Sequence, residues 1–582
     1  MQKPLQDLVA VAAGEKPADL VLKNAQVFHV FTGEFLPGDV AIQGGYIAGV
    51  GRYSGREEVD LKGRYLTPGF IDGHVHLESG LVSPTEFARL VVAAGTTTVI
   101  ADPHEIANVV GERGIQFILD ATEDLPLRVY VMLPSCVPAS PLEQSGADLS
   151  AQELEPFLKH PRVIGLGEVM DFPGVLNQDE AVFAKLRMAG NRPIDGHAPG
   201  LEGYALTAYI AAGIGSDHEC VTPEQALERL RQGMYLMLRE GSAAKNLLQL
   251  LPVVTPKTAW RCMFVTDDRH PEDLVNLGHI NHLVRLAVKE GLDVSLALQM
   301  ASINAANCFG LRDVGAIAPG YRADLLAFSD LVSWQPERVW QNGVLAAENG
   351  QALQVNARVD ERIVRDTMHL ARVDKEQLRL PAQSPIARVI GLIPGQLVTE
   401  DLELPVKVVD GAFIAQPEKD IIKLAVWERH KGSGRVGVGL LRGLGLKRGA
   451  IASTVAHDSH NLVVAGVNDE DMLLAVRQAE RMQGGLVAVA DGLVLGSLPL
   501  PLAGLMADRE VEWVQEELAI LQTVARDLGI RPDYDPFMTL AFLSLPVIPE
   551  LKLTDAGLVD VASAKIVPVS VLQSRTANSN GA

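Results

Sequence analysis

The chain has 582 residues, of which 47% are hydrophobic and 21% are charged, and its net charge is −21. This is the balance of a folded protein, and the length predicts two or three domains. The negative charge argues against a nucleic-acid backbone as a partner, and we expect none, but it does not argue against a neutral base as a substrate.

The cysteines and the N-terminal sequence favour the reducing cytoplasm. The four cysteines contain no C-x-x-C pair, so we expect neither a thiolate zinc site nor a disulfide framework. Residues 1–14 lack a signal-peptide pattern, and no apolar run approaches the length of a membrane span. We therefore expect a cytoplasmic protein that does not associate with membranes.

Short strands punctuated by glycines are expected in residues 1–68 and again in residues 312–360, where Asn342-Gly343 is a hairpin signal. Because the two stretches lie on either side of a central region, we expect them to form one small β-sandwich domain.

The central region, residues 69–311, alternates short apolar strands with helical stretches. About eight such units predict a (β/α)8 barrel, an α/β fold, with a doubly wound open sheet as the alternative. After a strand that ends near Ile71, the expected strands are Thr97–Ala101, Val129–Leu133, Val163–Leu166, Pro193–Gly196, Ile214–Ser216, Tyr235–Leu238 and Arg261–Thr266. The expected helices are Pro84–Ala94, Asp179–Ala189, Leu201–Ala212, Thr222–Arg231 and His279–Lys289.

The pattern changes after residue 360. Residues 361–404 are charged, contain prolines and predict a connection. Residues 405–570 predict a C-terminal α+β domain, with a hairpin across 486–495 and a helix across 509–527. Residues 571–582 are polar and predict a disordered tail.

His74 and His76 follow the first strand of the central region. Residues i and i+2 of a strand point to the same side, so the two imidazoles can face one point and form part of a metal site. Alone, the pair could equally be two unrelated polar residues.

Further polar side chains follow the other strands. The C-terminal ends of barrel strands share one mouth, so these side chains are expected to meet there. Together with His74 and His76, they are Asp102, His104, Glu105, Glu168, Asp195, His197, His218, Glu219, Asp267 and Asp268. The number of histidines and carboxylates exceeds what one tetrahedral ion takes, which favours a two-metal centre. Glu168 can bridge two cations, and Asp267 can accept the proton of a bridging hydroxide, so the sequence predicts a metal-dependent hydrolase.

Several motifs identify a resemblance to the amidohydrolase superfamily and, within it, to the bacterial adenine deaminase family. They are Pro68-Gly-Phe-Ile-Asp-Gly-His-Val-His-Leu-Glu-Ser79, Ala101-Asp-Pro-His-Glu-Ile-Ala-Asn108, Gly165-Leu-Gly-Glu-Val-Met170, Asp195-Gly-His-Ala-Pro199, Ser216-Asp-His-Glu219, Phe264-Val-Thr-Asp-Asp-Arg269, Ala456-His-Asp-Ser-His-Asn461 and Leu498-Pro-Leu-Pro-Leu-Ala-Gly-Leu-Met506. One departure is Gly80, where a second serine is expected.

The resemblance implies hydrolysis of adenine to hypoxanthine and ammonia in purine salvage, by a metal-bound hydroxide that attacks C6. It implies two divalent ions, manganese first, with iron or zinc as alternatives, and a homodimer or larger homo-oligomer. By position, the first ion would be held by His74, His76, Glu168 and Asp267, and the second by Glu168, His197 and His218. His104 is either a ligand or a group beside the substrate.

Asp267 is expected to take the hydroxide proton, and Glu219 or His104 to protonate a ring nitrogen. Glu78 and Asp268 are expected near the substrate. His457 and His460 could bind a further metal, close over the barrel mouth, or form an ordinary polar turn. The alternatives are another amidohydrolase, such as a cytosine deaminase, a cyclic-imide hydrolase or an amino-sugar deacetylase, and a non-catalytic metal-binding scaffold.

Overall fold

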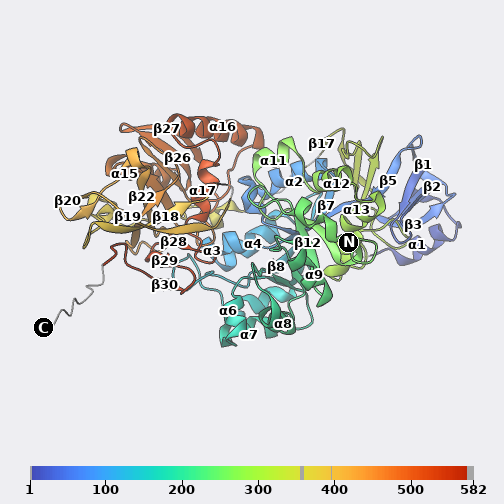
Figure 1. Cartoon of the computed structure of the whole chain (residues 1–582). Coiled ribbons are helices and arrows are strands. Elements are labelled where there is room, and N and C mark those ends of the chain that lie inside the picture. The colour runs from blue at the N-terminus through green and yellow to red at the C-terminus, as the bar shows by residue number, and fades with distance from the viewer. Residues whose placement is uncertain (1–2, 354, 356–358, 395, 573–582) are drawn as a thin grey trace. The chain divides into compact units, whose positions relative to one another are not determined.

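The chain forms two compact units in a computed structural model that describes residues 3–353, 355, 359–394 and 396–572 (Figure 1). The first unit comprises residues 1–104, 115–136 and 149–360, and the second comprises residues 105–114, 137–148 and 361–582. The second unit thus includes two short segments from the stretch in which the barrel was expected. The domain boundaries drawn from the sequence stay predictions, and most of the expected tail lies outside the described residues.

Eight parallel strands of the first unit pair in chain order, five in one sheet and three in another. The Gly215 amide donates to the Ile194 carbonyl at 2.9 Å, and a parallel bridge joins Val75 to Asp267. These contacts connect the two sheets at both ends, so the expected barrel is confirmed. The strands are β6 (Phe70–Val75), β7 (Thr96–Ala101), β8 (Arg128–Leu133), β9 (Val163–Val169), β10 (Ile194–Gly196), β11 (Ser216–Asp217), β12 (Tyr235–Arg239) and β13 (Cys262–Val265).

Helices alternate with these strands, and some of them begin at a residue whose side chain caps the first turn. Ser83 accepts from the Glu86 amide and Thr222 from the Gln225 amide, each before a proline at the first helical position. The five expected helices are confirmed to within two residues. The helices are α2 (Pro84–Ala93), α3 (His104–Val110), α4 (Glu112–Ala121), α5 (Ala151–Leu154), α6 (Phe172–Leu176), α7 (Glu180–Ala189), α8 (Gly203–Ala211), α9 (Pro223–Arg231), α10 (Leu247–Leu250), α11 (Pro271–Asn276), α12 (Ile280–Lys289), α13 (Val294–Met300) and α14 (Ile303–Cys308).

A nine-stranded sheet joins strands from both sides of the barrel sequence. β5 (Tyr65–Pro68) pairs antiparallel with β14 (Leu325–Phe328), which gives the expected single domain from two pieces. The expected hairpin at Asn342-Gly343 is present, and both residues adopt the positive φ that this turn requires. The remaining elements are α1 (Leu5–Ala12), β1 (Ala18–His29), β2 (Glu34–Gln43), β3 (Tyr46–Gly51), β4 (Gly55–Asp60), β15 (Arg338–Gln341), β16 (Val344–Glu348) and β17 (Gln351–Ala352).

The second unit is built on an eight-stranded sheet in the order β19-β18-β23-β22-β25-β24-β26-β27. α15 (Asp469–Arg481) buries Met472, Val476 and Ala479 in the same apolar core as side chains of this sheet. The expected hairpin is β26–β27, and the expected helix is α16 (Val511–Asp527). The strands are β18 (Ile386–Leu392), β19 (Thr399–Pro405), β22 (Ile421–Trp427), β23 (Val436–Arg442), β24 (Ala450–Ser453), β25 (Leu462–Gly466), β26 (Gly485–Ala490) and β27 (Leu493–Pro499).

Smaller elements complete this unit. They are β20 (Val408–Val409), β21 (Ala412–Phe413), α17 (Pro536–Phe542), β28 (Leu551–Thr554), β29 (Gly557–Asp560) and β30 (Lys565–Ile566). Among the residues that the structure describes, in either unit, no helix has the length and apolar character needed to span a bilayer.

Candidate metal centre

Four side chains at the ends of β6, β9 and β13 surround one point in the barrel. His76 Nε2 lies 3.2 Å from Glu168 Oε1 and 3.1 Å from Asp267 Oδ1. His74 Nε2 lies 3.7 Å from the same Glu168 oxygen, 3.5 Å from the same Asp267 oxygen, and 3.2 Å from His76 Nε2. Ligands about 2.1 Å from a tetrahedral ion are roughly 3.4 Å from one another, so the spacing fits a bound cation.

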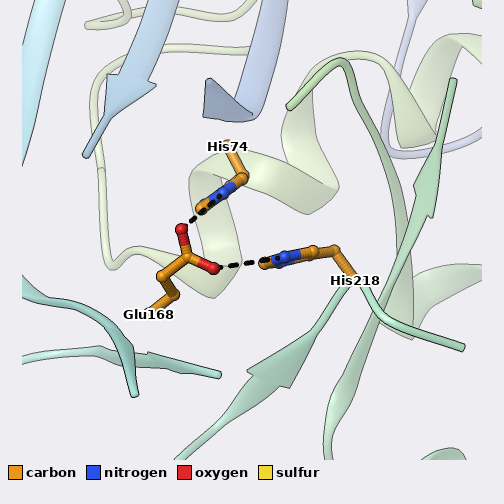
Figure 2. Close-up of side chains that lie close together, drawn as sticks. All are labelled: His74, Glu168 and His218. Carbon is orange, nitrogen blue, oxygen red and sulfur yellow. Dashed lines mark ion pairs between the residues drawn. The ribbon is translucent and has the colours of Figure 1, made fainter. Parts of the chain in front are cut away.

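A second group forms around the other oxygen of Glu168. His197 Nδ1 lies 2.8 Å and His218 Nε2 3.4 Å from Glu168 Oε2, and the two ring nitrogens are 3.3 Å apart. Figure 2 shows one Glu168 oxygen directed toward His74 and the other toward His218. Glu168 therefore has the geometry that a bridging ligand would need, and the structure brings together the side chains of both predicted groups.

Hydrogen bonds from Nδ1 of His74 and His76 orient each ring so that its Nε2 faces the cluster. His74 Nδ1 donates to Asp195 Oδ2 at 2.9 Å, and His76 Nδ1 donates to the Asp102 carbonyl at 2.9 Å. With the proton on Nδ1, each neutral ring presents the lone pair of Nε2 to the cluster, as a metal ligand requires. Asp195 was expected at this mouth from the sequence, and the structure shows that its carboxylate accepts from His74, a role that the sequence did not reveal.

Burial and charge together create a strong demand for positive charge at this site. Burial lowers the pKa of His74, but hydrogen bonds to Asp195 and Asp267 outweigh burial and raise that pKa to about 10. For His197, the charges of Glu219 and Glu168 outweigh burial and raise the pKa to about 9. Burial raises the pKa of Glu168, yet hydrogen bonds from His197, His218 and His76 hold it well below its usual range. Without a cation, protons on the imidazoles therefore balance the carboxylates.

Arg239, the last residue of β12, joins the two carboxylates expected to handle protons. Its Nη1 donates to Glu219 Oε1 and also to Asp267 Oδ2, the latter at 2.8 Å. Burial raises the pKa of Glu219, but the charges of Arg239, His197 and His218 together outweigh burial and lower it. The sequence analysis missed Arg239, although a charged residue at the end of an apolar strand was a usable signal.

Asp267 and His104 are held close to both groups. Asp267 has a φ of 58°, its amide donates to the His74 carbonyl at 3.0 Å, and its carbonyl accepts from the His76 amide at 3.3 Å. A positive φ is costly for an aspartate, and backbone strain of this kind gathers at functional sites. His104 Nδ1 lies 3.4 Å from Glu168 Oε1, within a group of three side chains that could also hold an ion.

The remaining predicted residues do not belong to either group of donors. Asp268 is half-buried and accepts a hydrogen bond from the Ser79 hydroxyl. Glu78 is buried in the short 3₁₀ helix η1 (Leu77–Gly80). Their contact with a substrate stays a prediction. His457 and His460 form a separate cluster with Glu105 in the second unit.

The barrel and the second unit each match a known family. The sequence pattern of the amidohydrolase family matches residues 65–353, and that of the adenine deaminase C-terminal domain matches residues 396–565. A protein of Carboxydothermus hydrogenoformans named adenine deaminase 2 is 63% identical over 569 residues, which are 98% of this chain and 100% of that protein.

The chain belongs to the adenine deaminase family. A relative in Desulfatibacillum aliphaticivorans, named adenine deaminase, is 50% identical over 95% of this chain and 97% of its own length. Another of the same name in Halalkalibacterium halodurans is 48% identical over 99% of this chain and all of its own length. The family resemblance inferred from the motifs is confirmed. The amidohydrolase family is hydrolytic and typically metal-dependent, which agrees with the donor groups in the barrel.

Proposed function

We propose that this chain hydrolyses adenine to hypoxanthine and ammonia, with two divalent cations held by the barrel cluster. The relatives' names and the match to both family patterns support the substrate. The observation that carries the two-cation proposal is the position of Glu168, whose two oxygens face two separate groups of histidines. Imidazole and carboxylate donors suit manganese, iron and zinc, and we propose manganese first.

His74, His76, Glu168 and Asp267 would hold one cation, and Glu168, His197 and His218 the other. When bound, the two cations lower the pKa of a water molecule to near neutrality and stabilise developing negative charge. The remaining steps fall to the side chains of this chain and to the substrate.

Proton transfer is assigned to Asp267 and Glu219. In the net reaction, the oxygen of water forms a bond to C6 of adenine, and the bond from C6 to the exocyclic nitrogen breaks. Asp267 accepts a proton from the attacking water and passes it to the exocyclic nitrogen, which leaves as ammonia. Glu219 protonates a ring nitrogen as C6 becomes tetrahedral and takes up the second proton of the former water as the C6 carbonyl forms. Because Arg239 favours the ionised form of Glu219, Glu219 acts as a relay that gains a proton before it donates one. His104 is the other possible donor.

Asp267→Asn tests the central assignment. We expect turnover to fall at least 10³-fold, roughly the effect of removing a positioned proton acceptor. The measurements are ammonia release from adenine and metal content by elemental analysis, with the exposed Asp124→Asn as the control. Normal turnover by Asp267→Asn with both ions bound would remove Asp267 from this role.

The substrate is tested separately with the unaltered protein. We expect ammonia from adenine and no comparable turnover of cytosine, a hydantoin or an N-acetylated amino sugar. A higher turnover of any of these other compounds would contradict adenine as the substrate, but it would not contradict the proposed metal centre.

A further inference from the structure

The second unit contains a buried cluster of two histidines and one glutamate that the proposed reaction does not use. Glu105 lies in α3, whereas His457 and His460 lie in the loop between β24 and β25. All three residues are buried, with 2%, 6% and 1% of their surface exposed, respectively. His457 Nδ1 lies 2.7 Å from Glu105 Oε1, and His460 Nε2 contacts Glu105 Oε2.

The donor atoms are close enough for a metal ion, so the proton positions must decide what the cluster does. The amide of Ala456 donates to His460 Nδ1 at 3.0 Å, which requires a lone pair on Nδ1. In a neutral ring the single proton must then be on Nε2, directed at Glu105. Burial lowers the pKa of His460 to about 4 despite the nearby Glu105, which agrees with a neutral ring.

The loop is held so that both rings face Glu105. The His457 ring stacks on Phe542 of α17, with ring centroids 4.6 Å apart and planes 17° from parallel. The His457 amide donates to the Ala541 carbonyl, and Arg429 Nε donates to the His460 carbonyl. The Asn461 side chain donates to the Gln144 carbonyl. These contacts fix the loop from several sides and leave each ring little freedom to turn.

We propose that His457 and His460 are N–H donors that clamp the Glu105 carboxylate and are positioning residues for the reaction. Each carboxylate oxygen accepts from one ring, so the clamp fixes both the place and the orientation of the Glu105 side chain. Glu105 is the second residue of α3, and the first is His104, whose ring lies beside Glu168. Holding Glu105 therefore restrains the first turn of the helix that carries His104. This inference rests on the proposed function for its effect on turnover, but not for the proton positions.

Isosteric amides provide matched variants for each ring. An asparagine amide nitrogen occupies roughly the place of Nδ1 of histidine, and a glutamine amide nitrogen roughly that of Nε2. His457→Asn and His460→Gln therefore keep the donor that faces Glu105, whereas His457→Gln and His460→Asn move it. The two pairs exchange the same residue types, so differences within a pair report donor position rather than loss of the ring.

The expected result is a loss confined to turnover. We expect kcat for adenine to fall about tenfold or more in His460→Asn and His457→Gln, with KM changed less than threefold. The donor-keeping variants should recover most of kcat. Manganese bound per chain, measured by titration of the metal-free proteins with Mn²⁺ alone, should equal that of the unaltered protein in all four variants.

Three outcomes would overturn the clamp. One is equal kcat in the donor-keeping and donor-moving variants, whether both match the unaltered protein or both lose activity. Another is one fewer Mn²⁺ per chain in the variants, because the cluster would then hold an ion. A third is a change in KM alone. If the unaltered protein released no ammonia from adenine, the proposed function would fail, and the Mn²⁺ titration would still separate a hydrogen-bonded clamp from a metal site.

Discussion

Two buried clusters in this chain have nearly the same donors but differ in their outer hydrogen bonds. In the barrel, the outer nitrogens of His74 and His76 donate to oxygen atoms, so each inner nitrogen offers a lone pair once a cation displaces its proton. In the second unit, the outer nitrogen of His460 accepts from a backbone amide, so a proton faces inward. The inner atoms alone would suggest a metal site in both places.

The comparison shows that the partner of the far ring nitrogen decides the chemistry of a histidine cluster. An acceptor there, such as Asp195 Oδ2, prepares the ring to bind a cation. A donor there, such as the Ala456 amide, prepares the ring to donate to a carboxylate. The following predictions test this difference.

The largest expected effect comes from replacing Glu168, the central carboxylate of the barrel cluster, with glutamine. Glu168→Gln replaces one of two ligand oxygens with an amide nitrogen, which does not bind these cations. We expect less than two ions per chain and a loss of turnover of roughly 10⁴-fold, because several kcal/mol of metal stabilisation disappear. Elemental analysis and ammonia release measure both effects.

Glu105→Gln is the matched control for that experiment. It should retain both ions, because its carboxylate accepts N–H groups rather than a cation. If Glu168→Gln bound two ions, or if Glu105→Gln lost an ion, the proposal that only the barrel cluster binds metal would be wrong.

A smaller effect is expected from the outer hydrogen bond of His74. Asp195→Asn replaces a charged acceptor with a neutral amide, which weakens the fixed tautomer and the basicity of His74. We expect metal affinity to fall about 10- to 100-fold. Competition with a chelator gives the affinity, and the exposed Asp124→Asn should leave it unchanged. An unaltered affinity in Asp195→Asn would show that the outer acceptor does not prepare the ring.

The charge balance of the centre also predicts that metal binding depends on pH. The pKa values of His74 and His197, about 10 and about 9, mean that both rings hold protons at neutral pH without a cation. A cation must displace them, so the apparent affinity should rise by about tenfold per pH unit for each proton released, up to pH 9. Calorimetry in buffers of different ionisation enthalpy counts those protons, and a flat affinity would contradict the charge balance described for the centre.

The same pKa shifts predict how the stability of the cation-free protein changes with pH. Because these pKa values lie above that of an unfolded histidine, their contribution to the free energy of unfolding is complete below about pH 6.5. It should be lost as the pH rises through 9 and 10. Chemical denaturation across this range checks the direction.

The side chains of the barrel cluster were predictable because one rule of topology applies to all of them. His74, His197 and His218 are far apart in the sequence, but each follows a parallel strand, and such strand ends share one mouth. Arg239 obeys the same rule and was missed only because it is not a metal ligand. The clamp follows no such rule. Glu105 contacts His457 because two segments of the barrel sequence belong to the second unit. The periodicity of apolar residues predicts helices and strands, but it does not predict which distant segments come together.

The nine-stranded sheet cannot form completely until most of the first unit has been synthesised. β5 emerges early, yet its antiparallel neighbour β14 follows the whole barrel sequence. At roughly 5–20 residues per second, β5 waits on the order of tens of seconds on the ribosome for that neighbour. During this interval one edge of β5 has unpaired amides and carbonyls, so this edge is open to pairing with another chain.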